Sequence, residues 1–526
     1  MAQPQNNIQI AAPGFAGLNT QDSPVGMDLS FAAQADNCVI DSYGRIASRK
    51  GLATFTQDPE TTGNMDDNPV ETAYEYVTAD GTRVLLLAGD KDGGSTSTLW
   101  SQDTSGALTT VTGLSATNNN WSYTSLSDQC FMAQNGESVL YTDGTTVQPM
   151  TQQPTAGPGG ISNPNIIISA FGHLFVANGD TNKSTVQWST ITTGTGLGGA
   201  ATPWSGGGAG TIDVEEYWPN GSDEIVALAA HNNFLVVFGR RSILVYNVPT
   251  DPNGAGVGPD NMFLADTIEN IGCVARDSVV SIGTDVLFLD ASGVRSLGRT
   301  LEYKTQPIGD MSKNVRDELI TALSQSELPV RAAYSPEEAM YALILPRTSD
   351  GFCITYVFDT RRPMEDGTLR VTRWTGRGLR CAVRTDSGDF FFGRAGGLYK
   401  YTGGDDTSVL TSEVSPLGIT MTYLTRAQDF DAPSRSKFPK QVDLILIGGA
   451  SLNLTVQWYF DFSSASNNYT IERSASLGAL WGEGEWGTGV YGESGGLISN
   501  ESVNMWGSGK NIQLGFVGTI SEQPVS

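Results

Sequence analysis

Residues 225–248, which read IVALAAHNNFLVVFGRRSILVYNV, constrain the fold of this chain more than any other segment. Three short apolar runs, rich in β-branched and aromatic residues, are separated by polar turns at 231–233 and 239–241. These turn residues tolerate sharp reversals, so the segment predicts an antiparallel meander of three strands. Because the runs are almost continuously apolar, we expect other sheets to cover both faces of the meander.

Similar units recur along the chain with different residues. They repeat at a loose period of roughly 40 to 58 residues, which is the spacing of propeller blades. A ring of blades buries both faces of each sheet and leaves only short edges exposed, as the apolar runs require. The sequence therefore predicts an all-β protein with a β-propeller of five to seven blades. The predicted units lie at 84–101, 125–142, 166–190, 225–248, 278–297, 330–358 and 379–401.

The 526 residues exceed what one hydrophobic core usually organises, so more than one domain is expected. We predict an extended N-terminal arm over 1–55 and a propeller over 56–414. The blade rhythm stops after residue 405, and alternation at Leu454, Val456 and Trp458 predicts a C-terminal β-sandwich over 415–526. The arm is expected to pack on this C-terminal domain or on a neighbouring subunit.

Three segments interrupt the predicted blades. Two insertions, 152–165 and 192–210, are rich in Gly with Pro or Thr and are expected to form loops at one rim of the ring. Apolar residues at helical spacing predict one helix over 311–325. That helix either covers the space between two blades or contacts another subunit.

The composition limits the functions that this chain can have. Its formal net charge is −25, which argues against tight binding to DNA or RNA. This negative charge does not argue against a protein along which nucleic acid moves without being bound. The five cysteines are scattered without a CxxC pair, which predicts reduced, buried thiols. The N-terminus lacks a secretory signal pattern, and no apolar run is long enough to cross a bilayer. We therefore expect a protein that is made in a cytoplasm, stays soluble and has no membrane-spanning segment.

Motifs that would carry chemistry are incomplete. GTGLGG at 194–199 matches a nucleotide-binding signature but is not followed by the helix that the signature needs. Asp90 and Asp92 resemble the start of a calcium loop, but Ser101 occupies the position of its last acid. The only histidines, His173 and His231, lack further zinc ligands at a defined spacing. We therefore predict no catalytic residue, cofactor or metal, although the many acids leave paired carboxylates for glycoside cleavage open.

The most distinctive charge feature is a run of arginines in a chain otherwise short of them. These residues either pair with nearby acids on hairpins, dock an acidic neighbour such as another copy of this chain, or contact phosphates in a channel. The run comprises Arg361, Arg362, Arg370, Arg373, Arg377, Arg380 and Arg384.

A glycine-rich and aromatic segment, 480–496, lies between the predicted sandwich strands. It either folds on its own aromatic rings or projects as a contact loop. Together with the arginines, its rings complete the predicted subunit interface. The candidate interface residues are Arg361, Arg362, Arg370, Arg373, Arg377, Trp481, Trp486 and Tyr491.

Several segments, in order, resemble the tail nozzle proteins of short-tailed phages (podoviruses), a family also called tail tubular protein B. They are GFAGLNTQDSPVGMDLSFAAQADNCVIDSYGRIASRKGL, NNFLVVFGRRSILVYNV, IGCVARDSVVSIGTDVLFLDASGVRSL with the helix after it, and IQLGFVGTISEQPV. The resemblance covers most of the chain, and its motifs are structural rather than catalytic. It implies a virion tail protein, made in the host cytoplasm, whose homo-hexamer forms a nozzle below the portal and the tail adaptor (upper tail tube). Genomic DNA would leave through its lumen without tight binding, and tail fibres or spikes would attach around it.

Two other classes of function fit an all-β propeller. A carbohydrate-binding or glycan-cleaving propeller on the tail surface would need a concave pocket lined with aromatic residues and paired acids. A cytosolic scaffold that binds peptides would be expected to be a monomer.

Overall fold

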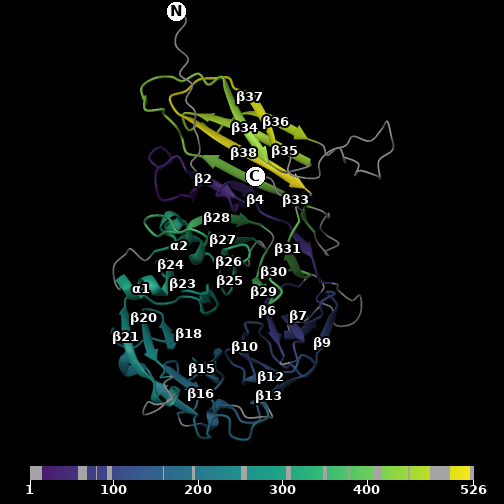
Figure 1. Ribbon diagram of the computed structural model, residues 1–526, viewed down its shortest axis with the longest axis vertical. Helices are drawn as coiled ribbons and strands as arrows, with labels where there is room; N and C mark the ends of the chain where they lie inside the picture. The colour runs from purple at the N-terminus through teal and green to yellow at the C-terminus, as the bar shows by residue number, and fades with distance from the viewer. Residues whose placement is uncertain are drawn as a thin grey trace, which may run out of the picture.

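The computed structural model describes residues 15–521, except 57–64, 66–67, 79, 92–96, 158, 192–195, 250–257, 304–309, 348–351, 377, 404, 408–416, 448–450 and 474–497. Over these residues the chain is almost entirely β-structure. Figure 1 shows a ring of small sheets with a separate sheet-rich unit above it. The predicted all-β propeller with an additional C-terminal β-unit is confirmed.

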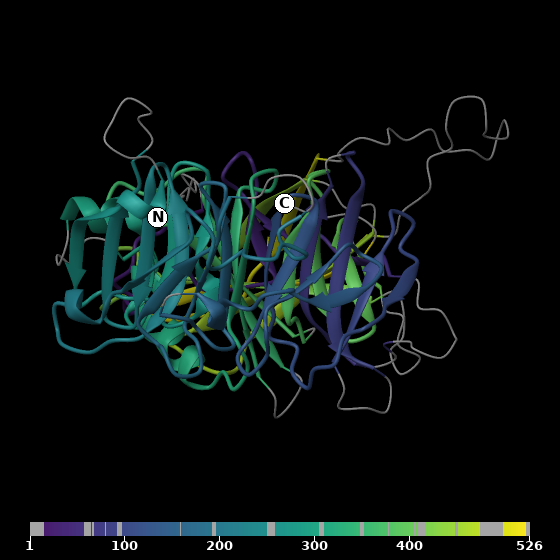
Figure 2. The same cartoon turned by 90° about the horizontal axis from the view of Figure 1, so that it is seen from below.

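Seven antiparallel meanders follow one another through the described part of the chain and form the ring. Figure 2 shows the strands of the ring running side by side through its thickness. Blade 1 holds β6 (Val70–Val77), β7 (Arg83–Asp90), β8 (Ser97–Gln102) and β9 (Leu108–Val111); blade 2 holds β10 (Ser122–Leu126), β11 (Gln129–Ala133), β12 (Leu140–Thr142) and β13 (Val147–Pro149); blade 3 holds β14 (Ile166–Ala170), β15 (His173–Ala177), β16 (Thr185–Trp188) and β17 (Gly210–Asp213). Blade 4 holds β18 (Ile225–His231), β19 (Phe234–Gly239), β20 (Ser242–Asn247) and β21 (Phe263–Glu269); blade 5 holds β22 (Val280–Ser281), β23 (Val286–Asp290) and β24 (Gly293–Ser296); blade 6 holds β25 (Arg331–Ser335), β26 (Met340–Pro346), β27 (Cys353–Asp359) and β28 (Arg370–Thr375); blade 7 holds β29 (Cys381–Arg384), β30 (Phe390–Arg394) and β31 (Gly397–Tyr401).

The ring is closed by a strand from the opposite end of the chain. β5 (Leu52–Thr54) pairs antiparallel with β31 and becomes the outermost strand of blade 7. The first strands of neighbouring blades contact one another, and β29 of blade 7 contacts β6 of blade 1. The N-terminal segment therefore completes the last blade. Strands from the beginning and from the end of the propeller sequence thus pair in one sheet.

Two of the predicted units, 125–142 and 166–190, start with an apolar run that reads as one strand but forms a hairpin. The run 125–133 reverses at Ser127 and Asp128, whose φ angles are 49° and 62°, so that β10 and β11 form a hairpin. The run 166–176 reverses in the same way at Phe171 and Gly172, between β14 and β15. These turns were missed because Ser and Phe are not typical residues for left-handed backbone.

The predicted helix begins later than expected. A 3₁₀ turn, η6 (Lys313–Val315), leads into α2 (Arg316–Ser324), whose Leu319 and Ala322 are buried. A second helix, α1 (Leu297–Tyr303), directly follows β24 where the sequence predicted only the end of a strand. Shorter 3₁₀ turns are η1 (Pro154–Ala156), η2 (Glu215–Tyr217), η3 (Pro259–Asn261) and η4 (Arg276–Ser278).

Beyond the ring, the C-terminal residues form two facing sheets. One sheet has the order β2-β33-β38-β35-β36, and the other pairs β34 with β37. Val456, Trp458 and Val503 lie in the core between them. The strands are β33 (Leu417–Thr425), β34 (Gln441–Ile447), β35 (Ser451–Phe460), β36 (Asn467–Arg473), β37 (Ile498–Asn504) and β38 (Ile512–Ser521).

The N-terminal segment joins this unit to the propeller. β2 (Phe31–Asp36) pairs antiparallel with β33 and meets β28 of blade 6 at Asp36 and Arg373. Its neighbours are β1 (Gly17–Leu18), which pairs with β2, and the hairpin of β3 (Cys38–Ile40) and β4 (Ile46–Ser48). Residues 15–56 thus contact both the C-terminal unit and the ring, between which they lie in Figure 1.

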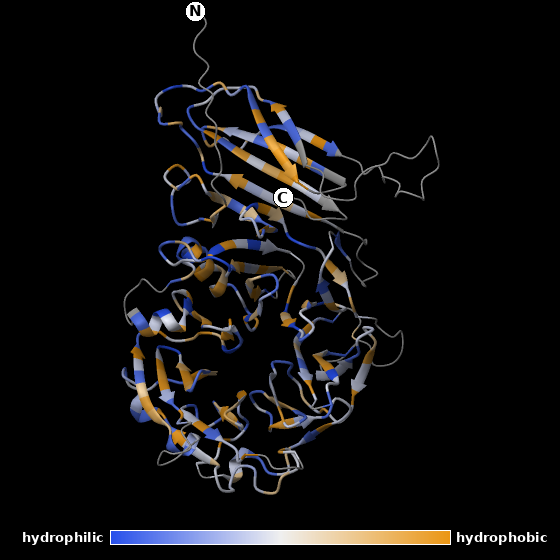
Figure 3. Cartoon of the chain, in the orientation of Figure 1, coloured by the Kyte–Doolittle hydropathy of each residue, from blue (hydrophilic) through white to orange (hydrophobic). Residues whose placement is uncertain are grey.

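Apolar side chains from adjacent blades pack together in clusters around the ring. Figure 3 shows the hydrophobic stretches concentrated on the strands. All five cysteines are buried and unbridged, as the sequence predicted. Burial raises the pKa of the Cys273 and Cys353 thiols to about 11, so these thiols stay protonated near neutral pH.

Candidate functional site

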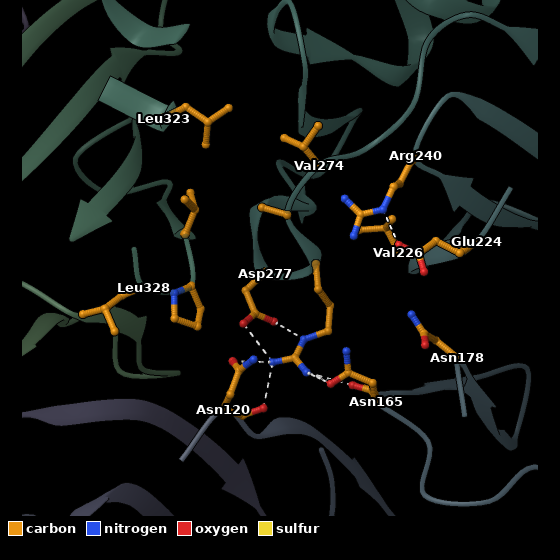
Figure 4. A pocket seen from close by; sticks show the side chains of 14 residues that line it. Asn120, Asn165, Asn178, Glu224, Val226, Arg240, Val274, Asp277, Leu323 and Leu328 are labelled. Atoms are coloured by element: carbon orange, nitrogen blue, oxygen red, sulfur yellow. Dashed lines mark hydrogen bonds and ion pairs between the residues drawn. The ribbon is translucent and has the colours of Figure 1, made fainter. Parts of the chain in front are cut away.

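A cavity of about 310 Å³ lies where the first strands of several blades begin. Asn165 directly precedes β14, Glu224 directly precedes β18, and Asn120 stands two residues before β10. Leu323, near the end of α2, and Leu328 and Pro329 beyond it add apolar side chains to the lining, and Figure 4 shows the two leucines opposite Asn165. Blades 2, 3 and 4 thus contribute residues from an equivalent position, just before their first strands.

The Arg276 side chain connects several of these residues by hydrogen bonds. Its Nη1 donates to the backbone and side-chain oxygens of Asn165 at 2.8 and 2.9 Å. Its Nη2 donates to the corresponding oxygens of Asn120 at 3.1 and 3.0 Å, and its Nε donates to Asp277 at 2.7 Å. One guanidinium therefore connects blades 2, 3 and 5 across the centre of the ring.

Further charged residues extend this network. Arg331 donates from Nη2 to Asn120 Oδ1 at 2.8 Å, and its Nε lies 3.5 Å from Asp277 Oδ2. Burial acts to raise the pKa of the Asp277 carboxyl, but Arg276 outweighs burial, and the pKa lies below its usual value. Asp277 is therefore a carboxylate that counters two arginines, rather than a proton donor.

The two acids that line the cavity are both engaged in ion pairs, Asp277 with Arg276 and Glu224 with Arg240. His173 is buried against the Ser189 carbonyl oxygen, away from the residues that line the cavity. Among the described residues, no group of three or more His, Cys, Asp or Glu side chains is placed to hold a metal ion.

The structure places the candidate interface arginines between parts of this chain. Arg373 donates from Nε and Nη2 to Asp36 at 2.6 and 3.0 Å, and from Nη1 to Glu318 of α2. Burial acts to lower the pKa of Arg373, but its bonds to Asp36 outweigh burial and raise it. Arg361 donates to the carbonyl oxygens of Ile40 and Glu338, both at 2.8 Å.

The other candidate interface residues are more dispersed. Arg370 is half-buried opposite Asp359 in the β27–β28 pairing, and Arg362 is exposed. Arg377, Trp481, Trp486 and Tyr491 lie outside the described residues. Arg361 and Arg373 thus hold the arm against blade 6, while the role of the set as a subunit interface stays a prediction.

Sequence reasoning missed the axial residues Arg276, Asn120 and Asn165. A signal for them exists, because each stands one to four residues before the start of a first strand. Aligning the blades on those strands would have brought these polar positions together. The predicted unit 166–190 begins with β14, but the unit 125–142 begins three residues after the start of β10, so the first strands were not aligned.

Comparison with known proteins supports no family assignment. No protein-family model matches the chain, and no curated protein matches it. Among solved structures, it is similar to the WD40 β-propeller domain of Doa1, with 12% identity and a TM-score of 0.32 over 67% of this chain and 95% of that chain. It is also similar to YCF48 bound to D1 peptide, with 12% identity and a TM-score of 0.35 over 70% of this chain and 100% of that chain. No conclusion about function follows from likenesses this distant.

The fold and the site together define the class of protein. It is a β-propeller whose axial opening contains an internally paired polar network and whose last blade is completed by its N-terminal segment. Among the described helices, none is long and apolar enough to span a membrane.

Proposed function

We propose that this chain is a structural subunit of a short phage tail and that six copies of it assemble into the nozzle of that tail. In this role it conducts genomic DNA out of the virion without binding it tightly. It docks on the portal and the tail adaptor at one end and carries fibres or spikes outside. The resemblance of several segments, in the same order, to tail nozzle proteins suggests this role. The ion pairs that the arginines of the cavity and of blade 6 form with acids of the same chain support it.

The observation that carries the proposal is the way in which the propeller and the C-terminal unit are joined. Asp36, Arg373 and Glu318 bring the arm, blade 6 and α2 together, and β2 is paired with both units. A body joined by paired strands and half-buried ion pairs resists domain motion, which suits a load-bearing part of an assembly. A binding module on a flexible linker would not need these contacts.

The glycan-binding alternative receives no specific support. The residues that line the axial cavity include no aromatic side chain, and its two acids are paired with arginines. Glycan recognition and glycoside cleavage need aromatic platforms or a free pair of carboxyl groups.

Co-assembly tests the proposed function directly. The purified chain is mixed with a complex of portal and adaptor from a short-tailed phage that encodes it, and the products are imaged by electron microscopy. The expected result is a sixfold ring added below the adaptor. Failure to bind, together with sugar release or glycan-array binding by the isolated chain, would overturn the proposal in favour of the alternative.

A further inference from the structure

Three large aromatic side chains stand exposed together in the C-terminal unit. Phe438, Phe462 and Trp506 are 73%, 55% and 53% exposed. Their loops are bonded to one another: Lys437 N donates to Gly509 O at 2.7 Å, and Lys510 N donates to Asp461 Oδ1 at 2.7 Å. The aromatic side chains therefore belong to one surface, where β38 begins and β35 ends.

This surface is basic within an acidic protein. Residues 432–440 contain three cationic residues and no acid, and Lys510 stands in the adjoining loop. Three acids, Asp429, Asp431 and Asp461, share these loops with five cationic residues, and Asp461 accepts hydrogen bonds from the backbone N–H groups of Lys510 and Asn511. We call the surface the basic tip and define it as Arg435, Phe438, Lys440, Phe462, Trp506 and Lys510.

Asp461 and Phe462 form a tight turn after β35, in which the Ser463 N–H donates to the Phe460 carbonyl oxygen at 2.9 Å and both central residues have positive φ angles, 50° and 60°. In this turn the Phe462 side chain is more than half exposed.

A complementary surface lies on the outer strands of blades 3 and 4. Residues 209–223 contain four acids and no basic residue, and residues 258–272 contain three acids and no basic residue. The two segments meet, because Trp188 Nε1 donates to Asp260 at 3.1 Å and Val214 shares a core cluster with Met262. We call this surface the acidic rim and define it as Asp213, Glu215, Glu216, Tyr217, Phe263 and Glu269.

The acidic rim also presents aromatic side chains. Tyr217 and Phe263 are 46% and 57% exposed, and both acids before Tyr217 are exposed. Figure 1 places β21, which carries Phe263, in the ring and the strands of the C-terminal unit at the other end of the long axis. One chain therefore carries a basic aromatic surface and an acidic aromatic surface that are far apart.

We propose that the basic tip of one subunit docks on the acidic rim of a second copy of this chain. Charge complementarity selects and orients this contact, and the exposed aromatic side chains anchor it. Because the two surfaces differ, the contact is heterologous, and repeated contacts produce a closed ring or an open filament. The inference deepens the proposed nozzle assembly by naming the two surfaces that join its subunits.

Charge-reversed variants test this pairing by sedimentation velocity in low salt. The tip variant carries Lys440→Glu and Lys510→Glu, and the rim variant carries Glu215→Lys and Glu216→Lys. The wild-type chain is expected to associate, and the association is expected to weaken as salt rises. Each variant alone is expected to sediment as a monomer. Their mixture is expected to form a dimer of one copy each, because one intact tip then meets one intact rim.

The control carries Lys91→Glu and Arg316→Glu, two reversals on exposed residues outside both surfaces and outside the candidate interface arginines. It is expected to associate like the wild type, and circular dichroism checks that every variant is folded. Loss of association in the control would show a general effect of added negative charge and overturn the pairing. A wild-type chain that stays monomeric, or variants that do not pair when mixed, would also overturn it. Co-assembly with portal and adaptor remains a separate test, so the two proposals can fail independently.

Discussion

Arg49 and Asp406 form a buried, two-pronged ion pair that joins residues 357 positions apart in the chain. Nη1 and Nη2 of Arg49 lie 2.8 and 2.6 Å from the two carboxylate oxygens, and the side chains are 3% and 0% exposed. Asp406 Oδ1 also accepts a hydrogen bond, at 2.9 Å, from the backbone N–H of Leu52, which is the first residue of β5. The pair therefore fixes the strand that closes the propeller to the segment that leaves its last blade.

Removing one member of this pair should be costly. Arg49→Met leaves the Asp406 carboxylate buried without its cation, and we expect the free energy of unfolding in urea to fall by about 3–5 kcal/mol. Arg45→Met removes a pair with Asp41 in which the arginine side chain is 40% exposed, so its expected loss is below about 1 kcal/mol. Equal losses in the two variants would show that the buried pair does not hold the closure.

A substitution at Gly51, just before the closing strand β5, tests the same closure through the close packing of the backbone at this position. A Cβ at this position would lie 2.0 Å from the carbonyl oxygen of Asp405, which is backbone and cannot move away as a side chain can. We expect Gly51→Ala to destabilise the fold by about 1–3 kcal/mol or more, measured by thermal or urea unfolding. Gly199→Ala, where nothing lies within 4 Å, should change stability by less than about 0.5 kcal/mol. A tolerated Gly51→Ala would contradict this close approach.

The propeller could be predicted because its blades bury nearly continuous apolar runs. In blade 4, β18, β19 and β20 fall on the three runs of residues 225–248. The outermost strands are less apolar and were largely missed; the exposed Thr109 and Thr110 of β9 give no such signal. The addition of β5 to blade 7 could not be predicted either, because the pairing joins residues about as far apart as Leu52 and Tyr401.

Site prediction from composition was less successful. The arginine run was noticeable because its members are close in sequence, yet Arg361 and Arg373 mainly contact the distant residues Ile40 and Asp36. Arg276 stands alone in its sequence neighbourhood, and its importance depends on Asn120 and Asn165 from other blades. Pairing between residues more than 100 positions apart leaves no local pattern in the sequence.

Arg373 should control how firmly the C-terminal unit is attached. Arg373→Met removes the bonds to Asp36 and Glu318 and leaves the buried Asp36 carboxylate and the half-buried Glu318 carboxylate without their shared cation. We expect a loss of about 2–3 kcal/mol, because hydrogen bonds to charged groups are worth about 1.5–3 kcal/mol each and this site is partly solvated. Limited proteolysis should then cut faster between the propeller and the C-terminal unit. The exposed Arg362→Met serves as the control. Equal cleavage rates in the two variants would contradict the role of Arg373 in attaching the C-terminal unit.

Glu71 should make stability depend on pH in an unusual direction. Burial raises the pKa of its carboxyl, and the nearby Arg380 and Arg331 only partly offset this effect. A carboxyl with a higher pKa in the folded chain holds its proton more tightly there than in the unfolded chain. Its contribution to stability is therefore lost as pH rises from its usual pKa of 4.5 through the raised value.

Glu71→Gln removes this titration while keeping a polar side chain beside Arg380, whose Nε lies 3.8 Å from Glu71 Oε1. The variant should gain stability relative to the wild type as pH rises from about 4 to 7, measured by urea unfolding at each pH. The exposed Glu216→Gln, changed in the same way, corrects for the loss of one negative charge from an acidic protein. If Glu71→Gln instead loses stability relative to this control as pH rises, the ion pair with Arg380 outweighs burial, and the assignment of a raised pKa is wrong.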